Sequence, residues 1–444
     1  MASEVAPNMP LDSLFRRTVG MRRPRAEDIC RHLLEDLDSL TAASNSAAAA
    51  AACRAEMLST TSGSASGSTS PPPEVPLALE HSPACGDAEL SEGVRRQLQT
   101  ILEVFGEVAD SSERGACCGG GDDGSGERSA GDAGELLTQF LLADLPVRLV
   151  SSLADLEFEA RKDVISVFSV VVRLGSLGAG QQLFEYAEAH AKFYETLIDG
   201  YGRPEIAVHC GMMLRSCARH RRLVDAFFRR PEVAMRLMTL TSHGSFDVSS
   251  DAFSSLHDFL LIHKAASVAF LEANFQAFFR LYNGLLQSDD YVTQRQALKL
   301  LSEMLLDRTF MRVMLMYIGD EHFLQIHMNL LRADSKAIQF EAFHVFKIFV
   351  ANPQKPPRIQ QILYRNKDKL IKLLETLRAK RPDDKQFLED RSAIISKLEA
   401  LEALPPKAAA ASANRAPAVV PTCAPAVDVR PDCPAVVAAA GAPV

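Results

Sequence analysis

The chain has 444 residues, of which 47% are apolar and 23% are charged, so most of it can bury a hydrophobic core. The formal net charge of −8 argues against nucleic acid as the main partner, because nucleic-acid-binding domains are usually clearly basic. Tryptophan is absent and aromatic residues make up only 7%, which favours helices over a β-sandwich. The nine cysteines are odd in number and several lie in low-complexity stretches, so we expect free thiols in a reducing compartment.

The predicted location is the cytoplasm, and no contact with a membrane is expected. No apolar run approaches the roughly 18 residues that a transmembrane helix requires. The N-terminus lacks the short apolar stretch of a secretory signal. Its five arginines between residues 16 and 25 would suit a mitochondrial presequence, but Glu4, Asp12 and Glu27 dilute that pattern.

Residues 1–40 are predicted to form an N-terminal segment with one amphipathic helix over residues 26–40. The following residues, 41–88, have the composition of a low-complexity insert. An alanine run at 47–52 leads into a stretch rich in serine, threonine, glycine and proline. Such a composition buries too little apolar surface to offset the entropy of the chain, so we expect this insert to be disordered.

A helical-repeat domain is predicted over residues 89–404. It begins with a helix at about 90–108, and a glycine-rich insert at 110–134 interrupts it. From there on, apolar residues recur at three- and four-residue spacing, as in amphipathic helices. The remaining residues, 405–444, consist mainly of alanine, proline and valine and are predicted to form a disordered tail.

Five helices of this domain share one apolar pattern, a first position followed by apolar residues four and seven positions later. The first position, usually small, is held by Val164, Cys210, Ala252, Ala297 and Ala342. The two later positions are held by Phe168, Leu214, Leu256, Leu301 and Phe346, and by Val171, Cys217, Phe259, Met304 and Phe349. Successive first positions are 46, 42, 45 and 45 residues apart, a period typical of armadillo and HEAT repeats. We therefore predict an all-α solenoid of the armadillo/HEAT type, with an irregular helical bundle as the alternative.

Partner helices are predicted between the five repeat helices. Their apolar patterns place them at residues 223–242, 270–288, 322–333 and 361–380. A final helix over residues 385–403 has a charged outer face, which suits a terminal cap that has a neighbour on one side only.

No sequence motif indicates catalysis, a cofactor or a metal. The glycine-rich run at 119–126 lacks the lysine and serine or threonine of a phosphate-binding loop. Zinc could be bound by His209, Cys210, Cys217 and His220, but both cysteines fall on core positions of the repeat. The basic stretch at 219–230 leaves RNA binding as a weak alternative, because it lacks exposed aromatics that stack on bases.

One polar stripe is more informative. Tyr291, Arg295 and Lys299 are four residues apart and therefore share one face of a repeat helix. The core-facing side of that helix is predicted to carry Leu298, Leu301 and Leu305. Exposed tyrosine and arginine often dominate the binding energy of an interface, so we interpret the stripe as a partner-binding surface; an ordinary charged face is the alternative.

Several long segments resemble the calcium-binding protein 39 family, also called mouse protein 25. The segments that carry the resemblance are PEIAVHCGMMLRSCARH (204–220), FDVSSDAFSSLHDFLLIHK (246–264), YVTQRQALKLLSEMLLDR (291–308) and IQFEAFHVFKIFVANP (338–353). The resemblance implies an armadillo-like scaffold without enzymatic activity and, despite the name, without a calcium site. It also implies a STRAD-type pseudokinase or a Sterile-20-class kinase as a partner, held on the concave face in its active conformation. A second site would bind a C-terminal Trp-Glu-Phe peptide, and the free chain would be a monomer.

The resemblance also assigns residues. The kinase-facing stripe would consist of Phe246, Tyr291, Arg295 and Lys299. The arginine near the activation loop of a further, active kinase matches Arg308. The family's phenylalanine three residues later is Met311 here, with Phe310 beside it, which is a departure from the family pattern. The peptide pocket would include Met328, and Arg365 stands where the family has a lysine. A helical adaptor for cytoskeletal, basal-body or cell-morphogenesis assemblies, without kinase activation, is the alternative function.

Overall fold

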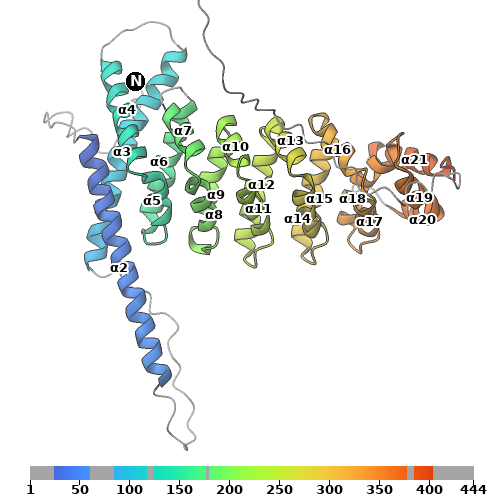
Figure 1. Cartoon of the computed structure of the whole chain (residues 1–444), viewed down its shortest axis with the longest axis horizontal. Coiled ribbons are helices and arrows are strands. Elements are labelled where there is room, and N and C mark those ends of the chain that lie inside the picture. Colours follow the sequence, from blue (N-terminus) through green and yellow to red (C-terminus); the bar gives the residue numbers. More distant parts are fainter. Residues whose placement is uncertain (1–24, 61–84, 118–124, 177–179, 378–384, 404–444) are drawn as a thin grey trace, which may run out of the picture.

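A computed structural model describes residues 25–60, 85–117, 125–176, 180–377 and 385–403, and within these residues every regular element is a helix. The helices stack side by side into an elongated body (Figure 1). The predicted tail at 405–444 lies outside the described residues. The all-α prediction is therefore confirmed for the described part of the chain.

The chain repeats a unit of three helices along most of its length. Each unit has a first, a second and a longer third helix. The units are α7 (Gln181–Ala189), α8 (Lys192–Gly200) and α9 (Pro204–Ala218); α10 (Arg221–Phe228), α11 (Pro231–Leu240) and α12 (Phe246–Leu261); α13 (Lys264–Ala273), α14 (Phe275–Leu286) and α15 (Tyr291–Leu306); α16 (Met311–Tyr317), α17 (Glu321–Leu330) and α18 (Lys336–Ala351); and α19 (Pro357–Arg365), α20 (Lys367–Thr376) and α21 (Lys385–Glu399). A short 3-10 helix, η2 (Arg308–Phe310), precedes α16.

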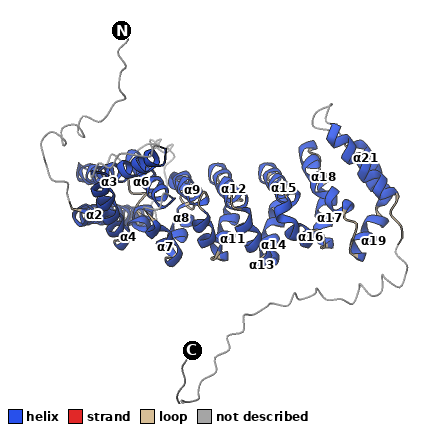
Figure 2. Ribbon diagram, turned by 90° about the horizontal axis from the view of Figure 1, so that it is seen from above, coloured by secondary structure: helices blue, strands red, loops and turns tan. Residues whose placement is uncertain are grey.

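Equivalent helices of successive units pack against one another. The third helices form the unbroken series α6 (Phe158–Ser176), α9, α12, α15, α18 and α21, each in contact with the next. The second helices α8, α11, α14 and α17 do the same. In Figure 2 the third helices follow one long edge of the stack, and the other helices lie on the opposite side. This regular stacking confirms the armadillo-like repeat.

The five first positions of the sequence repeat lie on the buried face of the third helices, and Cys210, for example, lies against Gly200 of α8. Their side chains are almost completely buried: Val164, Cys210, Ala252, Ala297 and Ala342 are at most 1% exposed. A small side chain there lets a neighbouring helix approach closely, and burial of the apolar residues four and seven positions later stabilises the packing. We call these five residues the close-packed positions.

Three of the four predicted partner helices are in fact pairs of helices. The segment 223–242 is divided into α10 and α11 at Pro231, which is the first residue of α11 and has no N–H to continue the preceding helix. Asn274 and Asn366 occupy the corresponding breaks in the segments 270–288 and 361–380. The apolar pattern continues across these breaks, which is why the sequence alone does not reveal them.

In the N-terminal part, the structure differs from two predicted boundaries, the end of the first helix and the extent of the glycine-rich insert. Helix α2 (Ala26–Thr60) continues for twenty residues beyond the predicted end at 40, and it extends away from the stack in Figure 1. Alanine has the highest helix propensity, so the alanine run prolongs the helix instead of ending it. Helices α3 (Cys85–Cys117) and α4 (Ser125–Leu142) likewise narrow the predicted insert at 110–134 to the undescribed residues 118–124. The remaining element, α5 (Leu145–Ser151), packs on α8.

A polar network joins α9 to α12 inside the stack. Arg215 donates to Asp251 across 2.9 Å, and the Tyr201 hydroxyl contacts both Asp251 and Ser255 at 2.8 Å. Gly211 makes room for this network, because a Cβ atom there would overlap the Asp251 carboxylate and lie 2.5 Å from the Tyr201 hydroxyl. The network fixes the two helices relative to each other, so the surface they carry is rigid.

Candidate partner-binding surface

Helix α15 separates polar from apolar side chains as its sequence predicts. Tyr291 is 46% exposed and the Lys299 side chain is 66% exposed. Arg295 lies between them on the same face and is partly exposed. The opposite face is buried and consists of Leu298, Leu301 and Leu305, none more than 3% exposed. The stripe therefore points away from the core.

Local contacts set the position of each member of the stripe. Asp290 caps α15 by accepting a hydrogen bond from the Thr293 N–H at 2.7 Å, which places Tyr291 at the first helical position. Hydrogen bonding to the side chain and then to the backbone of Thr293 lowers the pKa of Asp290. Lys299 lies 3.7 Å from Glu303, whereas Arg295 has neither a hydrogen bond nor an ion pair with any described residue. Arg295 is thus a free bidentate donor beside an exposed aromatic ring.

The stripe on α15 recurs on the other third helices. On each helix, the three residues of the stripe lie six residues before, two residues before and two residues after the close-packed position. The equivalent side chains are Phe158, Lys162 and Ser166 on α6; Pro204, Val208 and Met212 on α9; and Phe246, Ser250 and Ser254 on α12. We call these nine side chains, together with Tyr291, Arg295 and Lys299 of α15, the outward grid. All twelve are exposed or partly exposed.

The outward grid ends at the C-terminal side of the stack. On α18 the equivalent of Arg295 is Phe340, whose ring stacks on Phe387 of α21 at 5.4 Å between centroids. Helix α21 therefore covers part of this stripe, and in Figure 2 it tilts up beyond the edge formed by the other third helices. The open part of the grid consists of α6, α9, α12 and α15.

Phe246 adds an aromatic side chain to the same surface. It is the first residue of α12 and is 64% exposed. Because α12 packs directly on α15, Phe246 and Tyr291 begin neighbouring helices on one face. The structure thus brings together all four residues assigned to the kinase-facing stripe.

Arg308 and Met311 lie beyond the other end of α15, about 24 Å along the helix from Tyr291. Arg308 is exposed and has no partner among the described residues, and Met311 is 49% exposed. Phe310 is completely buried, so it cannot replace the family's phenylalanine at the surface. Exposed Leu306 and Leu315 extend the apolar surface around Met311.

The residues assigned to the peptide pocket lie on neighbouring helices. Met328 is half-buried on α17 and packs against the core. Arg365 ends α19, which contacts α17, and it is exposed without a partner among the described residues. The adjacent Tyr364 is 42% exposed and was not identified from the sequence.

The predicted zinc candidates do not form a metal site. Cys210 and Cys217 are completely buried in the core, and burial raises the pKa of both thiols well above the usual value. The ring of His220 packs near Phe184, and that of His209 packs near Phe158. Across the described residues, no group of three His, Cys, Asp or Glu side chains could hold a metal ion.

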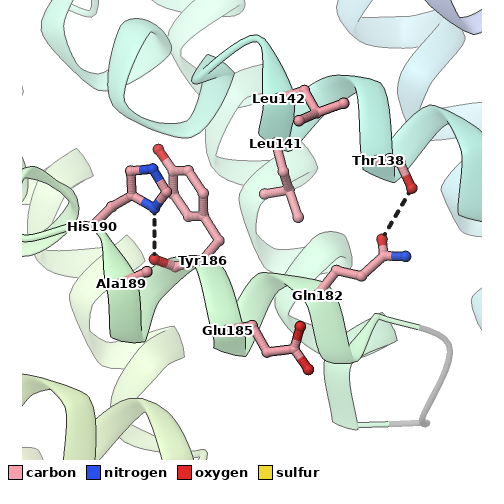
Figure 3. Close-up of a pocket in the computed structure, with 8 residues that line it drawn as sticks. All are labelled: Thr138, Leu141, Leu142, Gln182, Glu185, Tyr186, Ala189 and His190. Atoms are coloured by element: carbon pink, nitrogen blue, oxygen red, sulfur yellow. Dashed lines mark hydrogen bonds between the residues drawn. The ribbon is translucent and has the colours of Figure 1, made fainter.

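A pocket of about 440 Å³ lies elsewhere, between α4 and α7 (Figure 3). At one side of it the Tyr186 hydroxyl donates to Asp144, and the His190 ring stacks on that of Tyr186 with 4.1 Å between centroids. Thr138 bonds Gln182 across its other side. None of the residues predicted as sites lines this pocket.

Comparison with known proteins identifies the family. Residues 88–402 match the pattern of the Mo25-like family. The chain belongs to the Mo25-like family. It is 37% identical over 318 residues to a calcium-binding protein 39-like protein of Homo sapiens, covering 71% of this chain and 89% of that one. It is 40% identical over 313 residues to the degreening-related gene dee76 protein of Auxenochlorella protothecoides, covering 70% and 92%.

A further relative and one solved structure complete the comparison. The Mo25-like protein of Schizosaccharomyces pombe is 40% identical over 267 residues, covering 60% of this chain and 80% of that protein. A designed armadillo repeat protein aligns with a TM-score of 0.31 at 11% identity, covering 58% of this chain and 94% of that one.

Mo25-like proteins are non-catalytic scaffolds for kinases, so this family member is not an enzyme. No helix in the described ranges is long and apolar enough to span a bilayer. The sequence analysis identified Phe246 on α12 and the three α15 members of the outward grid, and it missed the remaining members on α12, α6 and α9. Their signal was present in the repeat, because each lies at the same distance from a close-packed position as Tyr291, Arg295 or Lys299.

Proposed function

We propose that the chain is a scaffold that binds a STRAD-type pseudokinase or a Sterile-20-class kinase on the outward grid and stabilises its active conformation. The observation that carries this proposal is the free guanidinium of Arg295 beside exposed Tyr291 and Phe246 on two packed helices. Aromatic and arginine side chains are the residues that most often dominate interface energies. Scaffold activity in the family supports the same assignment.

The mechanism that we propose is a shift in the populations of two kinase conformations. A scaffold favours whichever conformation it binds more tightly, and only the difference in affinity counts. A preference of about 3 kcal/mol would shift the equilibrium more than a hundredfold. The polar network around Asp251 supports this role, because a surface that does not deform cannot adapt to the conformation that fits it less well.

A second contact is proposed around Met328 and Arg365. The half-buried thioether of Met328 offers an apolar surface of the kind that accepts an indole ring. The free guanidinium of Arg365 suits the carboxylates of a C-terminal Trp-Glu-Phe peptide. Two weak contacts on one partner reinforce each other through effective concentration, so the peptide site would raise affinity for a pseudokinase that carries such a tail.

Contact with a further, active kinase is proposed at Arg308 and Met311. Arg308 supplies a free cation, and Met311 supplies a flexible apolar side chain where the family has an aromatic ring. A thioether adapts to its partner's shape, so Met311 would keep the apolar contact and lose the aromatic one. We further propose that the free chain is a cytoplasmic monomer.

The test is stimulation of a purified Sterile-20-class kinase by the full chain. Arg295→Ala is expected to lower stimulation several-fold, whereas the matched control Arg221→Ala, which removes an exposed arginine from α10, leaves it unchanged. Full stimulation by Arg295→Ala would contradict the assignment. Met328→Ala is expected to abolish retention on an immobilised Trp-Glu-Phe peptide. Peptide binding without any kinase stimulation by the wild-type chain would instead favour the cytoskeletal or morphogenesis adaptor.

A further inference from the structure

The pocket between α4 and α7 takes no part in the proposed kinase contact. Helix α7 is a first helix, so the pocket lies on the side of the stack opposite the outward grid (Figure 2). Its volume of about 440 Å³ falls within the roughly 300–1,000 Å³ that is usual for binding sites. The pocket therefore has room for a few side chains of a partner, and it stays accessible when the outward grid is covered.

Apolar side chains from α4 form one wall of the pocket. Leu141 packs against the core and points from α4 into the space between the two helices (Figure 3). Leu142, the last residue of α4, is 75% exposed, the largest exposed fraction of any large apolar side chain among the described residues. An apolar side chain that covered Leu142 would remove this surface from water, which is favourable.

The opposite wall consists of two aromatic rings that are held in place. The ring of Tyr186 stacks on that of His190 and meets the ring of Phe193 edge to face, with 6.0 Å between centroids. The Tyr186 hydroxyl donates to Asp144, and the His190 Nδ1 atom lies 3.0 Å from the Tyr186 carbonyl oxygen. Because these contacts fix both rings before a ligand arrives, ordering them adds little to the cost of binding.

Charge indicates what kind of ligand the pocket accepts. Glu185 is the only carboxylate among the described residues that line it, and none of these residues is a lysine or arginine. The neighbouring acids already have partners, because Asp144 accepts from Tyr186, and Glu188 lies 3.3 Å from Arg222. Glu185 is exposed and has neither a hydrogen bond nor an ion pair with any described residue. Its carboxylate is therefore available to a cation on the ligand.

We propose that this pocket binds a short peptide segment of a partner protein, in which an apolar side chain stands beside a lysine or arginine. The apolar side chain packs between Leu142 and the Tyr186 ring, and the cation pairs with Glu185. A peptide suits the pocket better than a small molecule, because small ligands are usually buried on most sides and this pocket opens to solvent past Leu142 and His190. The scaffold thereby holds a second partner on the side away from the outward grid.

The experiment uses N-acetyl-leucyl-arginine amide as the probe and measures its dissociation constant from the full chain by saturation-transfer NMR. The matched control probe carries citrulline in place of arginine, which keeps nearly the same shape and removes the charge. The wild-type chain is expected to bind the arginine probe about fivefold more tightly than the citrulline probe, as one partly exposed ion pair allows.

Three variants of the full chain locate the probe. Glu185→Gln keeps the shape of the side chain and removes its charge, so it is expected to bind the two probes equally. Leu142→Ala is expected to weaken binding of both probes about threefold through lost apolar contact. Glu232→Gln removes an exposed glutamate from α11 and is the control that changes neither affinity. All three substitutions are at exposed positions, so the thermal midpoint is expected to stay unchanged.

Four results would overturn the proposal. Equal binding of the two probes by the wild-type chain would exclude recognition of a cation. Wild-type affinity in both Glu185→Gln and Leu142→Ala would place the probe outside the pocket. The absence of any saturation transfer to the arginine probe would exclude the peptide site. Sedimentation of the free chain tests a different occupant: a dimer that Leu142→Ala dissociates would show that a second copy of the chain covers the pocket.

Discussion

The third helices carry two faces that differ in how strictly they repeat. On the buried face, every close-packed position holds a valine, cysteine or alanine, and the neighbouring positions hold large apolar residues. On the outward face, the position of Arg295 is held by lysine, valine or serine in the other open repeats. The buried face must fit the same neighbouring helix each time, whereas the outward face fits a partner once. Repetition therefore specifies the fold, and departure from repetition marks the surface used for binding.

The sharpest test of this contrast compares two residues that are two positions apart on α15. Leu301 is completely buried, and Leu301→Ala is expected to lower the free energy of unfolding by about 3 kcal/mol, because it leaves a cavity. Lys299 points outward, and Lys299→Ala is expected to change the free energy of unfolding by less than about 0.5 kcal/mol. Urea unfolding measures both, and similar effects of the two variants would contradict the assignment of faces.

A smaller effect is expected from glycines. Gly211→Ala places a methyl group against Asp251 and Tyr201, and overpacking of this kind costs about 1–3 kcal/mol. Gly284, on α14, has no atom within 4 Å of an added Cβ, so Gly284→Ala is expected to stabilise by about 0.5–1 kcal/mol through helix propensity. Relative to wild type, the midpoint temperature of thermal unfolding should fall for Gly211→Ala and rise for Gly284→Ala. A Gly211→Ala variant as stable as wild type would mean that the α9–α12 network is not tightly packed.

The smallest effect concerns pH. His327 is completely buried on α17, and desolvation lowers its pKa from 6.5 to about 3, while its Nε2 atom lies 2.9 Å from the Tyr317 hydroxyl. The unfolded chain therefore binds a proton at a pH where the folded chain does not. Stability present above pH 6.5 is lost as the pH falls toward 3. The loss is about 1 kcal/mol between pH 6 and pH 5.

The matched variant His327→Gln keeps a polar group that can bond Tyr317 and removes the titration. Chemical unfolding of wild type and variant at pH 7, 6 and 5 measures the two slopes. Wild type is expected to lose about 1 kcal/mol more than the variant between pH 6 and pH 5. Parallel slopes would show that His327 is protonated in the folded chain, and thus less buried than the structure has it.

The sequence predicted the buried face well, because the repeat of small and large apolar residues follows directly from helix packing. It predicted the orientation of Tyr291, Arg295 and Lys299 for the same reason. The division of residues 223–242 into two helices was missed, since the apolar spacing runs on through Pro231. The extent of α2 was missed because its alanine run was interpreted by composition and not by helix propensity. Phe158 and Met212 were missed because the spacing of Tyr291, Arg295 and Lys299 was not extended to the other repeat helices, although the repeat places both residues at equivalent positions.

Footprinting the side chains by hydroxyl-radical oxidation, with and without a bound Sterile-20-class kinase domain, tests the central claim most directly. The proposal predicts that Phe246 and Tyr291 lose reactivity in the complex, while the exposed Leu142 and Leu281, which lie outside the outward grid, keep theirs. Protection confined to the helices on the opposite side of the stack, with Phe246 and Tyr291 as reactive as in the free chain, would contradict it.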